Sequence, residues 1–200
     1  MGVRSRLITG ILASALMLGG GTALAQDASP EATPEEDEIL VSLQNADGEP
    51  VANASLIETD DGVAIAVTAG DDTGLEPGEH GFHIHETGLC EAPFESAGGH
   101  FNPTDATHGD IDADDSHAGD LGNLTVEDDG TIQFEITTDK ITLQEGEDNS
   151  LADEDGSALL IHAGEDDLES DPSGESGDRL VCGVIFPPAD SGTPVATPES

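Results

Sequence analysis

The sequence predicts an all-β domain built as an antiparallel β-sandwich or barrel, and three features of the chain lead to this prediction. Short runs of residues alternate between apolar and polar side chains with a period of two. Asp-Gly pairs at 47–48, 61–62 and 129–130 are typical of hairpin turns. Between these runs no segment has the periodicity of an amphipathic helix.

Several of these runs are expected to be strands, and a further strand is expected after Gly81, where His83 and His85 occur. The runs are residues 39–43, 54–57, 63–67, 124–126, 132–136 and 158–161. A strand-poor segment from Glu86 to Asp120 interrupts the pattern. Loops of this length within a compact domain are usually functional, which makes this segment a candidate functional loop.

The composition bounds the size of the protein and excludes several partners. The chain has 200 residues, enough for one domain with appendages, and its 44 acidic and 4 basic residues give a formal net charge of −40. Binding to nucleic acid requires lysine and arginine to neutralise phosphates. Nucleic-acid binding is therefore excluded, and so is attachment to an anionic membrane surface.

The first 25 residues have the pattern of a secretory signal peptide. Arg4 and Arg6 precede an apolar stretch over residues 7–18, and Ala23-Leu24-Ala25 is a suitable cleavage site. The apolar stretch is shorter than the ~20 residues that a membrane-spanning helix needs. We therefore expect no membrane span, cleavage before Gln26, and a protein that is secreted and extracellular, periplasmic or cell-wall associated.

Both ends of the mature chain are expected to be disordered. Residues 26–36 and 188–200 are rich in Pro, Thr, Ser, Ala and Glu, and they lack the apolar residues that ordering requires. The folded domain is therefore expected over residues 37–187.

Export also bears on charge and on the cysteines. The mature protein would keep 2 basic residues, Lys140 and Arg179, against 44 acidic ones, for a net charge of −42. Cys90 and Cys182 would lie in an oxidising compartment, where two cysteines permit one intramolecular disulfide.

Histidine is concentrated in one part of the chain. Six of the seven histidines lie between residues 80 and 117. A single histidine is most often solvated or hydrogen-bonded, but six so close together indicate a metal site. His83 and His85 share one face of the expected strand, with Cα atoms about 6.6–7 Å apart, so both imidazoles can reach one ion. His162 ends a later strand and is expected to add a nitrogen from across the barrel.

A second group of potential ligands lies on the long loop. Its members are His100, His108, His117 and Asp120. Three imidazoles and one carboxylate form the closed four-coordinate set that zinc prefers. The all-nitrogen set of His83, His85 and His162 suits copper. Chemistry alone leaves the division of the histidines between the two metals open.

Five segments of the chain together combine histidine, glycine and acidic residues: GEHGFHIHETGLC, AGGHFNP, HAGDLGN, LLIHAGEDDL and GDRLVCGVI. In order and spacing they resemble the copper–zinc superoxide dismutases, and the resemblance spans roughly Ile39 to Phe186. It implies a Greek-key fold with long metal-binding loops that hold copper and zinc. The implied reaction is disproportionation of superoxide to dioxygen and hydrogen peroxide, by copper cycling between Cu(II) and Cu(I) beside a structural zinc, as antioxidant defence outside the cytoplasm.

Residue roles follow from the same resemblance. The implied copper ligands are His83, His85, His100 and His162. The implied zinc ligands are His100, which bridges the two metals, with His108, His117 and Asp120. Arg179 corresponds to the arginine that attracts superoxide, and His100 would also deliver a proton to peroxide. Asp166 corresponds to the carboxylate that links a zinc histidine to a copper histidine, Cys90 and Cys182 to the family disulfide, and His80 to a structural histidine.

Two alternatives to an enzyme remain. A relative with the same fold could store, deliver or scaffold copper without catalysis, although such branches usually lose a ligand or the arginine, and this chain keeps them. The acidic runs at 110–115, 127–129 and 165–171 are compatible with a calcium-binding structural domain, but no spaced carboxylate loop with a terminal Glu is present.

The segment after His162 lacks the lysines that commonly guide superoxide in the family. The sequence leaves open whether the protein is a monomer or a homodimer.

Overall fold

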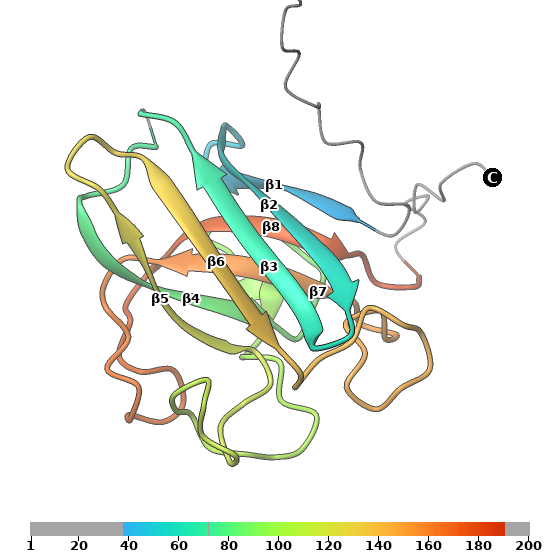
Figure 1. The fold of residues 1–200 in the computed structure, drawn as a ribbon. Helices are drawn as coiled ribbons and strands as arrows, with labels where there is room; N and C mark the ends of the chain where they lie inside the picture. Colours follow the sequence, from blue (N-terminus) through green and yellow to red (C-terminus); the bar gives the residue numbers. More distant parts are fainter. Residues whose placement is uncertain (1–37, 72, 191–200) are drawn as a thin grey trace, which may run out of the picture. The chain divides into compact units, whose positions relative to one another are not determined.

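Eight antiparallel strands form one closed barrel in the computed structural model, which describes residues 38–71 and 73–190. In their order around the barrel the strands are β1 (Ile39–Asn45), β2 (Pro50–Thr59), β3 (Gly62–Ala69), β6 (Ile132–Thr138), β5 (Asp120–Val126), β4 (Gly78–His85), β7 (Ser157–His162) and β8 (Arg179–Phe186) (Figure 1). β8 pairs again with β1 and closes the barrel. The predicted all-β class and antiparallel barrel are confirmed.

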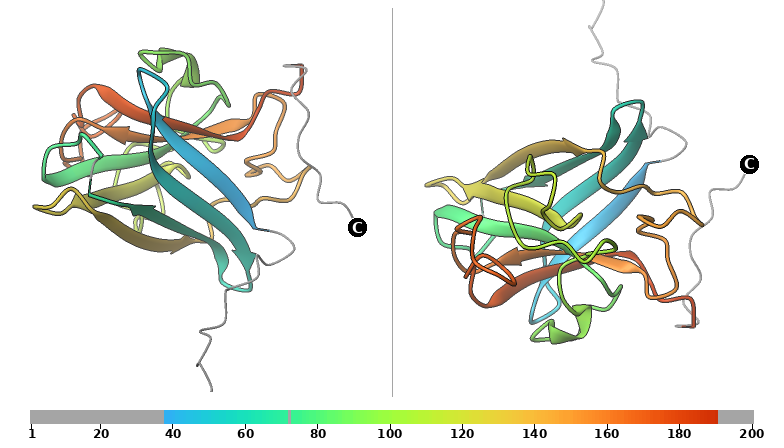
Figure 2. Two further views of the ribbon diagram at one scale, coloured as in Figure 1. Left: turned by 90° about the horizontal axis from the view of Figure 1, so that it is seen from above. Right: turned by 90° about the horizontal axis from the view of Figure 1, so that it is seen from below.

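The barrel is flattened into two facing layers (Figure 2). One layer contains β1, β2, β3 and β6, and the other contains β5, β4, β7 and β8. The connections over residues 70–77 and 139–156 each cross from one layer to the other, which produces the Greek-key order of strands. Leu43, Leu56 and Ile65 from the first layer pack in the core against residues such as Phe82 and Leu124 of the second.

The three Asp-Gly pairs occur at hairpin turns, as predicted, because β1–β2, β2–β3 and β5–β6 connect there. Two features of the fold were not expected. β8 is a full strand that the periodicity analysis did not propose, and a short 3₁₀ helix, η1 (Glu95–Ala97), lies in the long loop. None of the helices within the described residues is long and apolar enough to cross a membrane.

β4 has two chemically different faces. Phe82 and Ile84 belong to the hydrophobic core, whereas His83 and His85 alternate with them and point to the opposite face. Both histidines are nevertheless fully buried, because loops cover that face. β4 therefore contributes both to the core and to the functional site.

The position of His162 differs from the prediction. It was expected across the barrel, but β7 is the direct neighbour of β4, and His83 pairs with Leu160 while His85 pairs with Ala158. The prediction was wrong because the 139–156 connection crosses between the layers and returns the chain beside β4. On the other side of β7, His162 pairs with Arg179 of β8.

The expected signal peptide (1–25), the expected linker (26–36) and most of the expected C-terminal tail (188–200) lie outside the described residues. The boundaries of the expected domain, 37–187, remain a prediction for the same reason.

Candidate metal centre

Backbone hydrogen bonds fasten the long loop to the end of β4. The amide of Phe101 donates to the carbonyl oxygen of Ile84 at 2.8 Å, and the amide of Ile84 donates to that of Gly119 at 2.9 Å. The amide of Gly119 in turn donates to the carbonyl oxygen of Phe101 at 2.9 Å. These bonds bring the loop segments that carry His100 and His117 beside the histidines of β4.

The first group of potential ligands consists of four buried histidines whose candidate ligand atoms lie within 4.8 Å of one another. They are His83, His85, His100 and His162. Nδ1 of His85 donates to the backbone oxygen of Gly98 at 3.0 Å, and Nδ1 of His162 donates to the backbone oxygen of Gly177 at 3.2 Å. The Nε2 atoms of His85 and His162 are 3.4 Å apart. The long loop and the segment just before β8 thus orient these rings so that Nε2 faces the centre of the group.

The second group shares one histidine with the first. It consists of His100, His108, His117 and Asp120. The Nδ1 atoms of its three histidines lie 2.7, 3.1 and 3.2 Å from Oδ1 of Asp120. The other oxygen, Oδ2, accepts hydrogen bonds from the amides of Gly109 and His117 at 3.0 and 3.1 Å. The carboxylate is therefore held by the loop backbone with one oxygen turned toward three nitrogens.

Two ring nitrogens show that the residues fit metal ions. Among the described residues, Nδ1 of His83 and Nε2 of His100 are the buried side-chain polar atoms that have no hydrogen-bond partner. Buried polar atoms are nearly always paired, so a buried nitrogen left unpaired within a group of other ligand atoms is the expected state of a metal ligand. The first group offers the nitrogen ligands that copper favours, and the second offers the closed set of three nitrogens and one oxygen that zinc favours.

Asp166 connects the two groups. Its Oδ2 lies 2.7 Å from Nε2 of His83, and its Oδ1 lies 2.9 Å from Nε2 of His108. Asn123 fixes the backbone of Asp166 through two hydrogen bonds, at 2.7 and 2.9 Å. One carboxylate thus orients a histidine of each group, which is the position that the sequence resemblance implied for it.

Burial keeps the first group of imidazoles neutral in the metal-free protein. Loss of hydration lowers the pKa of His100 to about 4 and the pKa of His162 to about 3, and it holds the pKa of His85 well below its usual range. A neutral imidazole has a free lone pair, which a metal ion requires. These histidines can therefore bind a cation at neutral pH without first losing a proton.

In the second group, His108 behaves in the opposite way. Burial alone would lower the pKa of His108, but hydrogen bonds to Asp120 and Asp166 outweigh it and raise the pKa to about 10. Burial alone would likewise raise the pKa values of the two carboxyl groups, yet their histidine partners hold both well below the usual range. At neutral pH the metal-free protein thus holds a proton on His108, where a cation would be bound, and binding must release it.

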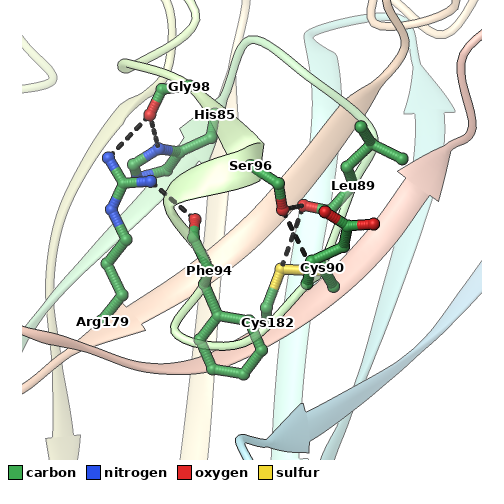
Figure 3. The surroundings of a disulfide bond; sticks show 9 residues. His85, Leu89, Cys90, Phe94, Ser96, Gly98, Arg179 and Cys182 are labelled. Atoms are coloured by element: carbon green, nitrogen blue, oxygen red, sulfur yellow. Dashed lines mark hydrogen bonds between the residues drawn. A yellow bond between two sulfur atoms is a disulfide. The ribbon is translucent and has the colours of Figure 1, made fainter.

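Arg179 lies beside the first group and is fixed by the disulfide-bonded part of the loop (Figure 3). Its guanidinium donates to the carbonyl oxygens of Phe94 at 2.7 Å and Gly98 at 2.6 Å. The oxygen of Gly98 also accepts from His85, so one carbonyl group orients both side chains. Burial lowers the pKa of Arg179, although Glu95 and Glu86 oppose the shift.

The predicted disulfide between Cys90 and Cys182 is present and joins the loop to β8. The Phe94 ring packs with Ala97 and Leu160 in a small buried cluster around it. An open cavity of about 460 Å³ lies outside the first group, lined by His85, His100, His162 and Arg179 together with the acidic residues Glu86 and Asp105. Of the described residues that line it, Arg179 is the one lysine or arginine.

Residues 51–185 match the family model described as copper/zinc superoxide dismutase. Superoxide dismutase [Cu-Zn] 2 of Aquifex aeolicus (strain VF5) is 42% identical over 180 residues, which are 89% of this chain and 98% of that protein. The chain belongs to the copper/zinc superoxide dismutase family. Membership supports superoxide dismutation as its reaction and makes copper and zinc its cofactors.

The chain is also similar to proteins whose names do not identify them as the enzyme itself. Superoxide dismutase-like protein YojM of Bacillus subtilis (strain 168) is 38% identical over 191 residues, which are 90% of this chain and 96% of that protein. A crystal structure of a SOD-like protein from Bacillus subtilis has a TM-score of 0.67 and 42% identity, covering 73% of this chain and 97% of that chain. The clock protein EA4 has a TM-score of 0.64 and 30% identity, covering 74% and 92%.

Within this family framework, His80 takes no part in either ligand group. Its two ring nitrogens lie 2.7 and 2.8 Å from the backbone oxygens of His162 and Glu76, so both ring nitrogens already have a hydrogen-bond partner.

The sequence reasoning missed Phe94, Gly98 and Gly177, because they act through backbone oxygens and carry no side-chain signature. It also gave Lys140 no role, although that residue contacts the loop of the second group.

Proposed function

We propose that this protein disproportionates superoxide to dioxygen and hydrogen peroxide at copper held by His83, His85, His100 and His162. We also assign zinc to His100, His108, His117 and Asp120. The observation that carries the proposal is the sharing of His100 between two buried four-ligand groups, with one ring nitrogen turned toward each. The overall reaction converts two superoxide ions and two protons into one dioxygen and one hydrogen peroxide.

Copper, when bound, supplies the Cu(II)/Cu(I) couple that oxidises one superoxide and reduces the next, while redox-inert zinc supplies a fixed charge. Arg179 offers a planar guanidinium at the cavity wall for the anionic substrate. Because two carbonyl groups hold that guanidinium, it need not reorganise when superoxide arrives. His100 can hold a proton on Nε2 when that atom is not a ligand and donate it to the reduced substrate.

Asp166 and the backbone oxygens complete the arrangement by fixing ring orientation. Each ring of the first group other than His100 makes a hydrogen bond through the nitrogen that faces away from the centre. Nδ1 of His100 instead faces Asp120 of the second group. The protein therefore presents its ligand atoms in place, and the cavity admits a small anion to one side of the first group.

We further propose that the enzyme acts outside the cytoplasm as an antioxidant defence, with residues 1–25 removed on export. The basic, apolar and small-residue pattern of these residues supports this proposal. The Cys90–Cys182 disulfide supports it as well, because such bonds persist in oxidising compartments. N-terminal sequencing of the protein from culture supernatant and cell fractions would test it, and a retained Met1 would contradict it.

The catalytic proposal is tested by metal analysis and superoxide decay on the same sample of the mature chain. We expect one copper and one zinc per chain, and rapid decay that disappears when copper is removed. Arg179→Ala should keep both metals but react roughly 10-fold more slowly or worse, with partial recovery in Arg179→Lys. Full metal content without acceleration would instead identify a metal-binding relative that is not an enzyme.

A further inference from the structure

Lys140 is one of two lysine or arginine residues in the described part of the chain, and neither forms an ion pair there with an aspartate or glutamate. This is unexpected in a protein with 44 acidic residues. Arg179 is bound to loop carbonyl groups beside the first ligand group. Lys140, which follows β6, makes the equivalent contact with the part of the loop that carries the second group.

The ammonium group of Lys140 donates to the carbonyl oxygen of Ala113 and to Oγ of Ser116, both at 2.5 Å. The Ser116 hydroxyl lies 2.6 Å from the carbonyl oxygen of Asp110 and can donate to it. Ser116 is buried and directly precedes His117. Lys140 thus reaches the chain one residue before a proposed zinc ligand.

The segment that Lys140 holds is unfavourable by itself. Residues 110–115 contain four exposed aspartates, whose like charges repel one another. A half-buried cation hydrogen-bonded to the backbone at the middle of this segment offsets that repulsion, and charge-assisted hydrogen bonds are stronger than neutral ones. Lys140 is itself anchored, since Asn149 donates to its carbonyl oxygen at 3.0 Å and its amide donates to Thr138 at 3.2 Å.

We propose that Lys140 is a positioning residue that holds residues 110–116 in place, so that His117 and Asp120 are oriented before zinc binds. The proposal rests on the zinc assignment made above. It differs from that assignment in predicting order in the metal-free loop, which Lys140 provides whether or not zinc is the ion. Lys140 takes no part in the first group, so copper binding should not depend on it.

The test uses the full chain with Lys140→Met, which removes the charge and the donors, and Lys140→Arg, which keeps both. Gln133→Glu is the matched control, because it also lowers the net charge by one and lies exposed on β6. Hydrogen exchange of the metal-free proteins and release of zinc to a chelator from the metal-loaded proteins are measured. Amides of residues 110–117 should exchange faster in Lys140→Met, while amides of β4 and β7 stay protected.

Zinc release should be roughly 10-fold faster in Lys140→Met, with copper retained, and close to the parent rate in Lys140→Arg and Gln133→Glu. Unchanged exchange and zinc release in Lys140→Met would overturn the proposal, and so would an equal effect of Gln133→Glu. His117→Ala separates a failure of the zinc assignment from a failure of the positioning role of Lys140. If His117→Ala keeps its zinc, the zinc assignment fails, while exchange in the metal-free Lys140→Met protein still decides the role of Lys140.

Discussion

Gly174 packs directly against the carboxylate of Asp166, with no room for a side chain between them. Gly174 has a φ of +63°, and a Cβ atom there would overlap Oδ1 of Asp166 and lie 2.7 Å from Nε2 of His108. The other oxygen of that carboxylate is hydrogen-bonded to His83. Gly174, which lies outside both ligand groups, therefore helps to fix one histidine in each group through Asp166.

Replacing Gly174 with alanine should weaken the binding of both metals. The added methyl group must displace Asp166, which frees the rings of His83 and His108, and loss of such outer partners typically costs about 10–100-fold in metal affinity. Metal retention against increasing chelator measures the effect. Gly146→Ala is the control, because Gly146 has a φ of +87° but no atom within 4 Å of a Cβ. Equal losses in the two variants would show that the contact with Asp166 is unimportant.

His100→Ala should reduce both copper and zinc content, because His100 is the residue common to the two ligand groups. His117→Ala should chiefly reduce zinc, because its ring contacts Asp120 and belongs to the second group alone. Copper and zinc are counted per chain after dialysis of each variant. Unchanged contents of both metals in His100→Ala would show that the bridging assignment is wrong.

The metal-free protein should lose stability as the pH falls below about 6.5. In the folded state burial holds the pKa values of His100 and His162 at about 4 and about 3, so the unfolded chain binds protons that the folded chain does not. His108 contributes with the opposite sign, since its raised pKa stabilises the fold below about pH 6.5 and that stabilisation is lost as the pH rises toward about 10. We therefore expect greatest stability near neutral pH.

Thermal unfolding of the metal-free protein between about pH 7 and about pH 4 measures the acid side of this dependence. His162→Gln should flatten the acid side, because it removes one group whose pKa differs between the folded and unfolded states. A transition temperature independent of pH over this range would contradict the prediction.

Reduction of the Cys90–Cys182 disulfide should loosen the loop before the barrel unfolds. The bond spans 92 residues, and the chain-entropy model assigns such a cross-link about 4–5 kcal/mol. Amides of residues 91–119 should exchange faster after reduction, while amides of the strands stay protected. Arg179 should become less restrained too, because both of its carbonyl partners lie in the loosened part. Equal exchange in the two redox states would rule out this anchoring role.

The catalytic efficiency kcat/KM should stay flat or rise with added salt. Glu86 and Asp105 line the cavity, and Arg179 is the one lysine or arginine that does so among the described residues. The screening length falls from about 10 Å at ~0.1 M salt to about 3 Å at ~1 M. Salt therefore suppresses distant acidic repulsion more than the short-range attraction of Arg179. Decay of superoxide after pulse radiolysis measures the effect, and a steep fall with salt would show that local attraction outweighs the net charge.

Strands and turns could be predicted because their patterns are local, as in β3 and the turn at Asp129-Gly130. β8 escaped prediction because Gly183 interrupts an apolar run that does not alternate, and glycine is depleted in strands. The neighbours of β7 depend on a connection that crosses between layers, which no local pattern encodes. Metal-binding side chains have distinctive chemistry and spacing, whereas the carbonyl groups that orient them do not.

The alternation of Phe82 and Ile84 with His83 and His85 makes β4 intolerant of a change in length. Inserting or deleting one residue before Phe82 would exchange the two faces of the strand. Imidazoles would then enter an apolar interior, and aromatic and aliphatic side chains would replace nitrogen ligands. A shift of register within the strand therefore removes the core and the metal ligands together. A change in length should therefore be tolerated better in the loops that β4 joins than within the strand itself.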